Sequence, residues 1–145
     1  MNDTLWIQRS LTLPPHAGGF YAITRDVTRA VPELSRINVG LLNLFLQHTS
    51  AALTIHENAD PDVLTDLRQG LDILAPESGN YAHSLEGTDD MPAHIKSSLL
   101  GPSLTVPVAN GQLLLGVWQD IYLCEFRRIP HHRTLILTLT GNLAK

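Results

Sequence analysis

The last third of the sequence consists of short apolar segments of alternating pattern, which predict a β meander rather than helices. Residues 104–108 lead into an Asn-Gly pair, the preferred sequence for a two-residue hairpin turn. Residues 113–128 are too long for one straight strand, so we expect a bend or bulge near residues 116–120. Residues 129–132 predict a turn, and residues 134–140 alternate as a final strand.

The chain also opens with a strand pattern. Residues 5–13 carry apolar side chains at alternate positions, apart from Arg9, and predict a strand that ends in a turn at residues 14–19. Thr24 is a candidate N-cap for a short helix, which Pro32 should end or kink because proline lacks the backbone N–H. The apolar face of this helix would consist of Val27, Val31 and Leu34.

Two more strands and two more helices are predicted in the middle of the chain. Residues 37–49 are apolar at both odd and even positions, which indicates a strand covered on both faces, and residues 53–55 predict a short second strand. Asp60-Pro61 starts a helix, with Asp60 as N-cap, and residues 90–101 predict another. The first of these helices has its apolar side chains at helical spacing: Val63, Leu64, Leu67, Leu71 and Leu74.

Strands at both ends with helices between them predict an α+β fold, with three helices and a largely antiparallel β-sheet or sandwich. The length of 145 residues fits a single domain, residues 1–145.

Composition excludes several classes of partner. A formal net charge of −4, with no long basic run, argues against nucleic acid. Cys124 is the single cysteine, so the chain has no internal disulfide and no Cys-rich zinc module. No apolar run approaches the roughly 20 residues that cross a bilayer, and the first nine residues lack a leader pattern. We expect a soluble, cytoplasmic protein with no membrane partner.

Polar residues that could carry chemistry gather at a few places. His48 follows an apolar strand, and strand ends hold side chains rigidly at a site. The alternative is a histidine satisfied by a backbone carbonyl.

His83 and His94 are near each other in sequence and surrounded by acids. Imidazole is a good zinc ligand, and a carboxylate can complete or orient the set, although the spacing fits no compact zinc motif. The alternative is a solvated acidic loop with an incidental histidine. The nearby acids are Glu77, Glu86, Asp89 and Asp90.

The helix start after Asp90 offers a second kind of site, because backbone N–H groups there could bind an anion with help from Lys96, Ser97 and Ser98. The alternative is that Lys96, Ser97 and Ser98 form an ordinary exposed face of the helix. Neither a phosphate-binding Gly-rich motif nor a Gly-x-Ser-x-Gly elbow is present, so a covalent hydrolase is unsupported.

Glu125 lies in phase with apolar residues of a predicted strand, where an unpaired carboxylate would be costly. It is either a buried ion-pair partner, with Arg127 on the same face, or a site carboxylate. Cys124 has the opposite phase, and packing is the better interpretation.

The segment from His48 to Asp60-Pro61, with motifs at residues 86–105 and 110–127, resembles the YjbQ family. The resemblance covers nearly the whole chain. It implies an α+β fold, a homotrimer, a polar pocket of shared histidines and acids, and a weak, secondary thiamine-phosphate synthase activity. By motif, the family's histidines and acids match His48, His83, His94, Asp90 and Glu125.

These observations lead to a working hypothesis of a metal-assisted transferase site. His48, His83 and His94 would bind a divalent cation, Zn²⁺ or Mg²⁺, which Asp90 or Glu125 completes or orients. We assign a phosphorylated small-molecule substrate to Lys96, Ser98 and Gln119. The rivals are a metal-dependent hydrolase of a phosphorylated or amide metabolite, and a non-catalytic protein that holds a metabolite or metal.

Overall fold

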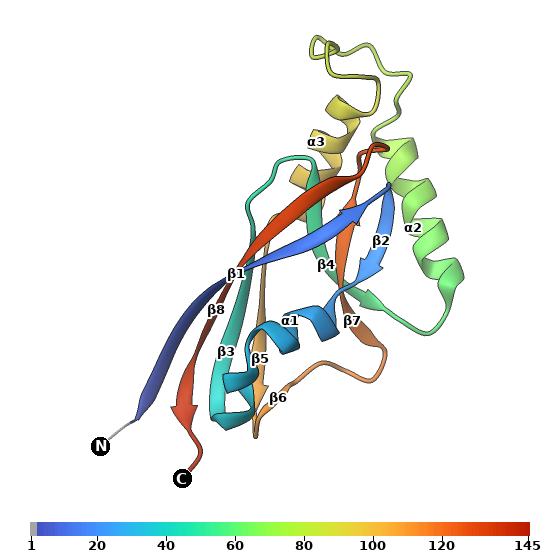
Figure 1. Ribbon diagram of the computed structural model, residues 1–145. Helices are drawn as coiled ribbons and strands as arrows, with labels where there is room; N and C mark the ends of the chain where they lie inside the picture. Colours follow the sequence, from blue (N-terminus) through green and yellow to red (C-terminus); the bar gives the residue numbers. More distant parts are fainter. Residues whose placement is uncertain (1–2) are drawn as a thin grey trace.

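The computed structural model describes residues 3–145, which form two antiparallel β-sheets with helices around them (Figure 1). Met1 and Asn2, part of the predicted domain, lie outside the described residues. The five-stranded sheet has the order β1 (Thr4–His16), β8 (His131–Leu143), β3 (Ile37–Leu46), β5 (Ser103–Ala109) and β6 (Gln112–Leu113). The three-stranded sheet has the order β2 (Gly19–Ala22), β7 (Gln119–Glu125) and β4 (Ala51–Glu57).

The helices confirm the predicted α+β class. They are α1 (Thr24–Ala30), α2 (Pro61–Leu74) and α3 (Asp90–Leu100), with a 3-10 turn at Pro32–Arg36. None of the helices in residues 3–145 is long and apolar enough to span a membrane.

The core lies between the two sheets, because alternate side chains of each strand point inward. Leu42 of β3 is paired with Leu139 of β8, and both are fully buried. They belong to one apolar cluster with Leu53 of β4 and Leu123 of β7, on the other sheet. This packing fixes the ends of β3 and β7, where two of the candidate site residues, His48 and Glu125, lie.

The Asn-Gly hairpin turn and the cap of α2 were predicted correctly. Asn110 and Gly111 have positive φ angles of 49° and 75°, as the predicted hairpin turn requires. The Asp60 side chain accepts a hydrogen bond from Asp62 N at 2.9 Å and caps α2 as predicted. The predicted break near residues 116–120 is also present, since the chain leaves one sheet after β6 and enters the other at β7.

Two local predictions were wrong. The N-cap of α1 is Ile23, not Thr24, whose hydroxyl donates to the Asp120 carboxylate and so joins α1 to β7. The predicted turn at residues 14–19 is shorter, because β1 continues to His16. Its two prolines are tolerated since β1 is an edge strand with an irregular register there.

Coverage of β3 on both faces was also a wrong prediction. Val39, Leu41 and Phe45 are 45–60% exposed, because nothing in residues 3–145 covers the outer face of the five-stranded sheet. Helix α2 buries less than its apolar pattern predicts, because Leu71, 9% exposed, is its one buried residue and Leu74 is 68% exposed.

Candidate functional site

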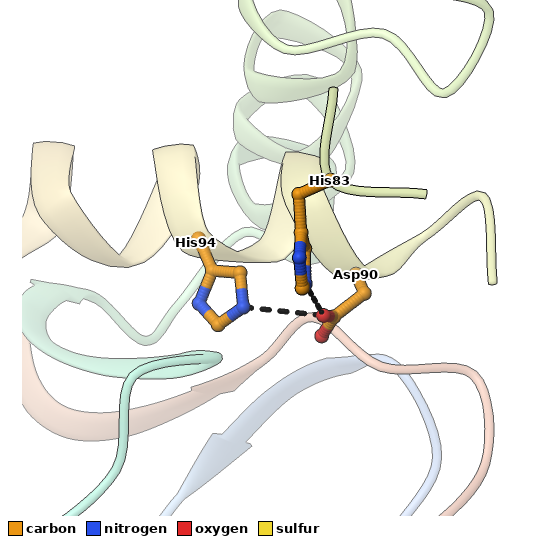
Figure 2. Close-up of side chains that lie close together, drawn as sticks. All are labelled: His83, Asp90 and His94. Carbon is orange, nitrogen blue, oxygen red and sulfur yellow. Dashed lines mark hydrogen bonds and ion pairs between the residues drawn. The ribbon is translucent and has the colours of Figure 1, made fainter. Parts of the chain in front are cut away.

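Two histidines and an aspartate meet at the start of α3 (Figure 2). Asp90 and His94 are four residues apart on this helix and therefore share a face. His83 reaches the same point from the loop between α2 and α3. His83 Nε2 lies 2.6 Å from Asp90 Oδ2, and His94 Nε2 lies 3.2 Å from the same oxygen. One ligand atom from each residue falls within 4.8 Å of the others.

The orientation of His94 places its Nε2 against the Asp90 carboxylate, where a proton or a metal ion must lie between the two atoms. Its Nδ1 lies 2.8 Å from the Thr49 carbonyl oxygen, which can only accept, so Nδ1 carries the hydrogen. In the neutral ring, the lone pair of Nε2 then faces the Asp90 carboxylate, and two acceptors repel unless a proton or metal ion lies between them. Metal-binding histidines are commonly oriented in this way by a backbone carbonyl.

Asp90 is held from its other side by Arg127. The guanidinium donates to Asp90 Oδ1 at 2.7 Å and to Asp89 Oδ2 at 3.1 Å, while Oδ2 of Asp90 stays turned toward the imidazoles. Burial alone would raise the pKa of Asp90, but the hydrogen bond to His83 and then smaller contributions from Glu86, His94 and, last, the charge of Arg127 outweigh it and hold that pKa below its usual range. The carboxylate is therefore kept ionised.

The cluster has the donor set of a transition-metal site. Two imidazole nitrogens with one carboxylate oxygen suit Zn²⁺, whereas Mg²⁺ prefers oxygen ligands. The His83 side chain is 45% exposed and that of Asp90 only 2%, so the cluster has one open side and one fixed side. An open side leaves room for water or substrate, as in catalytic metal sites.

His48 lies outside this cluster, although its neighbour Thr49 orients His94. Its Nε2 accepts a hydrogen bond from the Thr134 backbone N–H at 2.8 Å, which connects the end of β3 to β8. Burial, and then the charge of Arg133, lower the pKa of His48. The neutral His48 ring thus accepts a hydrogen bond from a backbone N–H. This is close to the structural alternative predicted from the sequence, in which the ring pairs with a backbone carbonyl.

Glu125 is a buried ion-pair partner, but of Arg133 rather than Arg127. The Arg133 guanidinium donates to both carboxylate oxygens at 2.6 Å, and both side chains are almost fully buried. The backbone N–H of Arg127 donates to the same carboxylate at 3.0 Å. Glu125 thereby fixes the corner between β7 and β8, from which Arg127 reaches Asp90.

The three residues assigned to substrate binding do not join the cluster. Lys96 follows His94 by two residues, on roughly the opposite side of α3, and its ammonium lies 2.5 Å from Asp72 Oδ1. Ser98 is exposed. Gln119 begins β7, at the far end from Glu125, and accepts a hydrogen bond from Gly116 N at 2.7 Å.

Sequence reasoning missed the arginines that support the site. Arg127 binds Asp89 and Asp90, and Arg128 donates to Glu77 at 2.7 Å and to Thr88 at 2.8 Å. A signal was present, since an Arg-Arg pair follows β7 and an Asp-Asp pair spans the start of α3. Cys124 packs in the core as predicted, where burial raises the pKa of its thiol.

Known proteins match this chain over most of its length. Residues 9–142 match the family model described as UPF0047 protein YjbQ-like. The UPF0047 protein YjbQ of Escherichia coli O157:H7 is 46% identical over 137 residues, which cover 94% of this chain and 99% of that protein. A UPF0047 protein of Synechocystis is 50% identical over 116 residues, 79% of each chain.

Solved structures show the same fold. A crystal structure of an uncharacterised YjbQ/UPF0047 protein from Clostridium acetobutylicum has a TM-score of 0.78 and 41% identity, covering 92% of this chain and 98% of that one. A YbjQ-like protein of unknown function from Sulfolobus solfataricus has a TM-score of 0.84 at 22% identity, covering 95% and 99%.

Proposed function

This chain belongs to the YjbQ-like UPF0047 family, and on that premise we propose that His83, Asp90 and His94 form the divalent-cation site of an enzyme that acts on a phosphorylated small molecule. The orientation of His94 carries the proposal. Its Nδ1–H is engaged by the Thr49 carbonyl at 2.8 Å, so Nε2 is the nitrogen free to bind a cation beside the Asp90 carboxylate. The donor set favours Zn²⁺ over Mg²⁺.

The surrounding residues have defined roles in this proposal. Arg127 holds Asp90 Oδ1 and keeps Oδ2 directed at the cluster. Asp90 is buried, so it orients both rings, while His83 is the member that solvent or substrate reaches. A bound cation would supply charge neutralisation for a leaving phosphate or pyrophosphate group.

The reaction class that we propose is transfer with release of pyrophosphate, as in a weak, secondary thiamine-phosphate synthase activity. That reaction joins a pyrimidine pyrophosphate to a thiazole phosphate. It needs alignment of the two rings and stabilisation of the leaving group more than covalent catalysis. This agrees with a site that consists of imidazoles and a carboxylate. The thiol of Cys124 is buried and does not belong to the site.

Hydrolysis is the second candidate. The 2.6 Å hydrogen bond between His83 and Asp90, on a ring that is 45% exposed, resembles an oriented general base that could activate water. The same residues then serve hydrolysis of a phosphorylated or amide metabolite.

We also propose that the protein works in the cytoplasm as a homotrimer. Trp6 and Leu41 are both directly opposite Thr140 on neighbouring strands, so they share the outer face of the five-stranded sheet with Val39 and Phe45. These four apolar side chains are 45–71% exposed in the single chain. Burial of such a face against other subunits would be favourable.

Metal titration tests the cation site without reference to activity. Metal-free protein should bind one Zn²⁺ per chain by calorimetry, and much less Mg²⁺ at the same concentration. His94→Ala should weaken Zn²⁺ binding about 10–100-fold or more, whereas His16→Ala, at the end of β1 and outside the cluster, should not. Equal Zn²⁺ affinity in both variants would refute the site.

Product analysis separates the two reaction classes. Purified protein is incubated with the pyrimidine pyrophosphate, with and without the thiazole phosphate, and with and without a chelator. Pyrophosphate release that requires both the second substrate and metal supports transfer. Release without the second substrate supports hydrolysis of this phosphorylated compound, and no release under any condition contradicts the transfer reaction.

A further inference from the structure

A separate cavity of about 210 Å³ lies on the other side of α3 from His94. It is enclosed by α2, by the glycine pair that joins β1 to β2, and by the chain around Phe126 after β7. Phe20, Leu71 and Phe126 give it apolar walls. The cavity is smaller than the pockets of roughly 300–1,000 Å³ that hold drug-sized ligands, and its size suits a small metabolite.

Lys96 places a positive charge in this cavity. The side chain is only 10% exposed, and its ammonium lies 5.7 Å from the centre of the Phe126 ring. Its ion-pair partner, Asp72, comes from α2 and is 58% exposed. A buried cation is therefore paired with a carboxylate that can turn outward into water, and a ligand anion could take its place.

A second cation borders the same cavity without a carboxylate partner. Arg68 lies one helical turn before Asp72 on α2 and forms no ion pair within residues 3–145. A Cβ added at Gly18 would lie 3.5 Å from the Arg68 guanidinium, so this charge stands beside the glycine pair. Of the other charged lining residues, Glu125 is neutralised by Arg133, and Arg128 by Glu77.

We infer that this cavity is a second binding site, for a small molecule with an anionic group on an apolar body about the size of one ring. Lys96 and Arg68 bind the carboxylate or phosphate, and Phe20, Leu71 and Phe126 contact the apolar part. The inference does not depend on the cation site, because none of the three cluster residues lines this cavity.

The Lys96–Asp72 pair provides a test in which a substitution is expected to strengthen anion binding. If the pair were only structural, loss of the Asp72 charge would leave anion binding unchanged. If the cavity is an anion site, Asp72 competes with the ligand for the ammonium, and Asp72→Asn should tighten binding by about three- to tenfold.

The experiment is an NMR titration of the ¹⁵N-labelled full chain with benzoate, phenyl phosphate and neutral benzamide. EDTA is present throughout, so that a bound metal cannot attract the anions. Backbone signals of Gly18, Phe20 and Phe126 should shift with both anions, and benzamide should bind at least about tenfold more weakly. The tighter of the two anions assigns the site to carboxylates or to phosphate esters.

Variants complete the test. Lys96→Met and Arg68→Gln should each weaken anion binding, by about tenfold and about threefold, while Arg29→Gln, an exposed arginine on α1, should not. Arg68 is exposed, so its variant stays informative if Lys96→Met unfolds. The inference is overturned if no cavity signals shift, if benzamide binds as well as benzoate, or if Asp72→Asn leaves the affinity unchanged.

Discussion

Glu125 and Arg133 form a buried ion pair whose side chains are 0% and 4% exposed. Arg133→Met leaves the carboxylate buried without its partner, and such losses cost about 3–5 kcal/mol. We expect this drop in the free energy of unfolding, measured by urea denaturation. The double variant Glu125→Gln/Arg133→Met removes the stranded charge and should recover part of the loss; a double variant that is less stable than Arg133→Met alone would contradict the account.

His48 makes stability depend on pH. Burial and then the charge of Arg133 lower its pKa in the folded chain, so the unfolded chain binds a proton more readily. Stability should therefore fall as pH drops below the ordinary histidine value of about 6.5. His48→Gln keeps an acceptor for Thr134 N but cannot titrate, and should flatten this part of the stability curve; an unchanged slope between pH 7 and pH 5 would argue against it.

Individual site residues were predictable only where the signal was local in sequence. The density of acids around His83 and His94 indicated the cluster, because the residues that form it lie within one loop and the first turns of α3. The partner of Glu125 could not be predicted, since Arg133 lies on a strand of the other sheet. The contact between Thr134 N and His48 was not predictable either, because it depends on the pairing of β8 with β3 across a long sequence separation.

At the scale of elements, strands β3 and β8 approach closely where Gly40 pairs with Gly141. A Cβ on Gly40 would lie 2.2 Å from the Thr140 carbonyl oxygen and 2.9 Å from Gly141 Cα, so backbone would have to move. Gly40→Ala should lower the free energy of unfolding by about 1–3 kcal/mol, as overpacking does. Chemical denaturation measures this directly.

Gly70 is the matched opposite case. It lies inside α2, and a Cβ there would meet nothing within 4 Å. Gly70→Ala should raise stability by about 0.5–1 kcal/mol, because alanine loses less backbone freedom in a helix. A Gly40→Ala variant as stable as the unaltered protein would contradict the close approach of β3 and β8, and a Gly70→Ala variant that loses stability would contradict the open surroundings of Gly70.

Most elements were predictable because their signals are short-range: a cap and proline for α2, Asn-Gly for the β5–β6 turn, and alternation for β8. The division of the strands into two sheets was not, since it depends on which strands pair across long separations. The prediction that both faces of β3 are covered was wrong for a related reason. Apolar residues on both faces of a strand do not reveal whether the chain itself or another molecule covers the outer face.

At the scale of the whole molecule, the exposed apolar face of the five-stranded sheet should mediate self-association. Light scattering after size exclusion should give about 48 kDa, three times the chain mass of 16.0 kDa. Leu41→Glu, on this face, should shift the mass toward one chain. Leu85→Glu, on a loop residue that is 98% exposed, should leave it unchanged, and a wild-type mass of one chain would refute the assembly.

The cation site is tested most directly by X-ray diffraction at the zinc absorption edge, from crystals grown with Zn²⁺. We expect one anomalous peak per chain at about 2.0–2.2 Å from His94 Nε2 and an Asp90 oxygen, with His83 as a further ligand. The proposed function would be contradicted if fully zinc-saturated crystals showed no peak at these three side chains. In that case His94 Nε2 would still contact the Asp90 carboxylate directly.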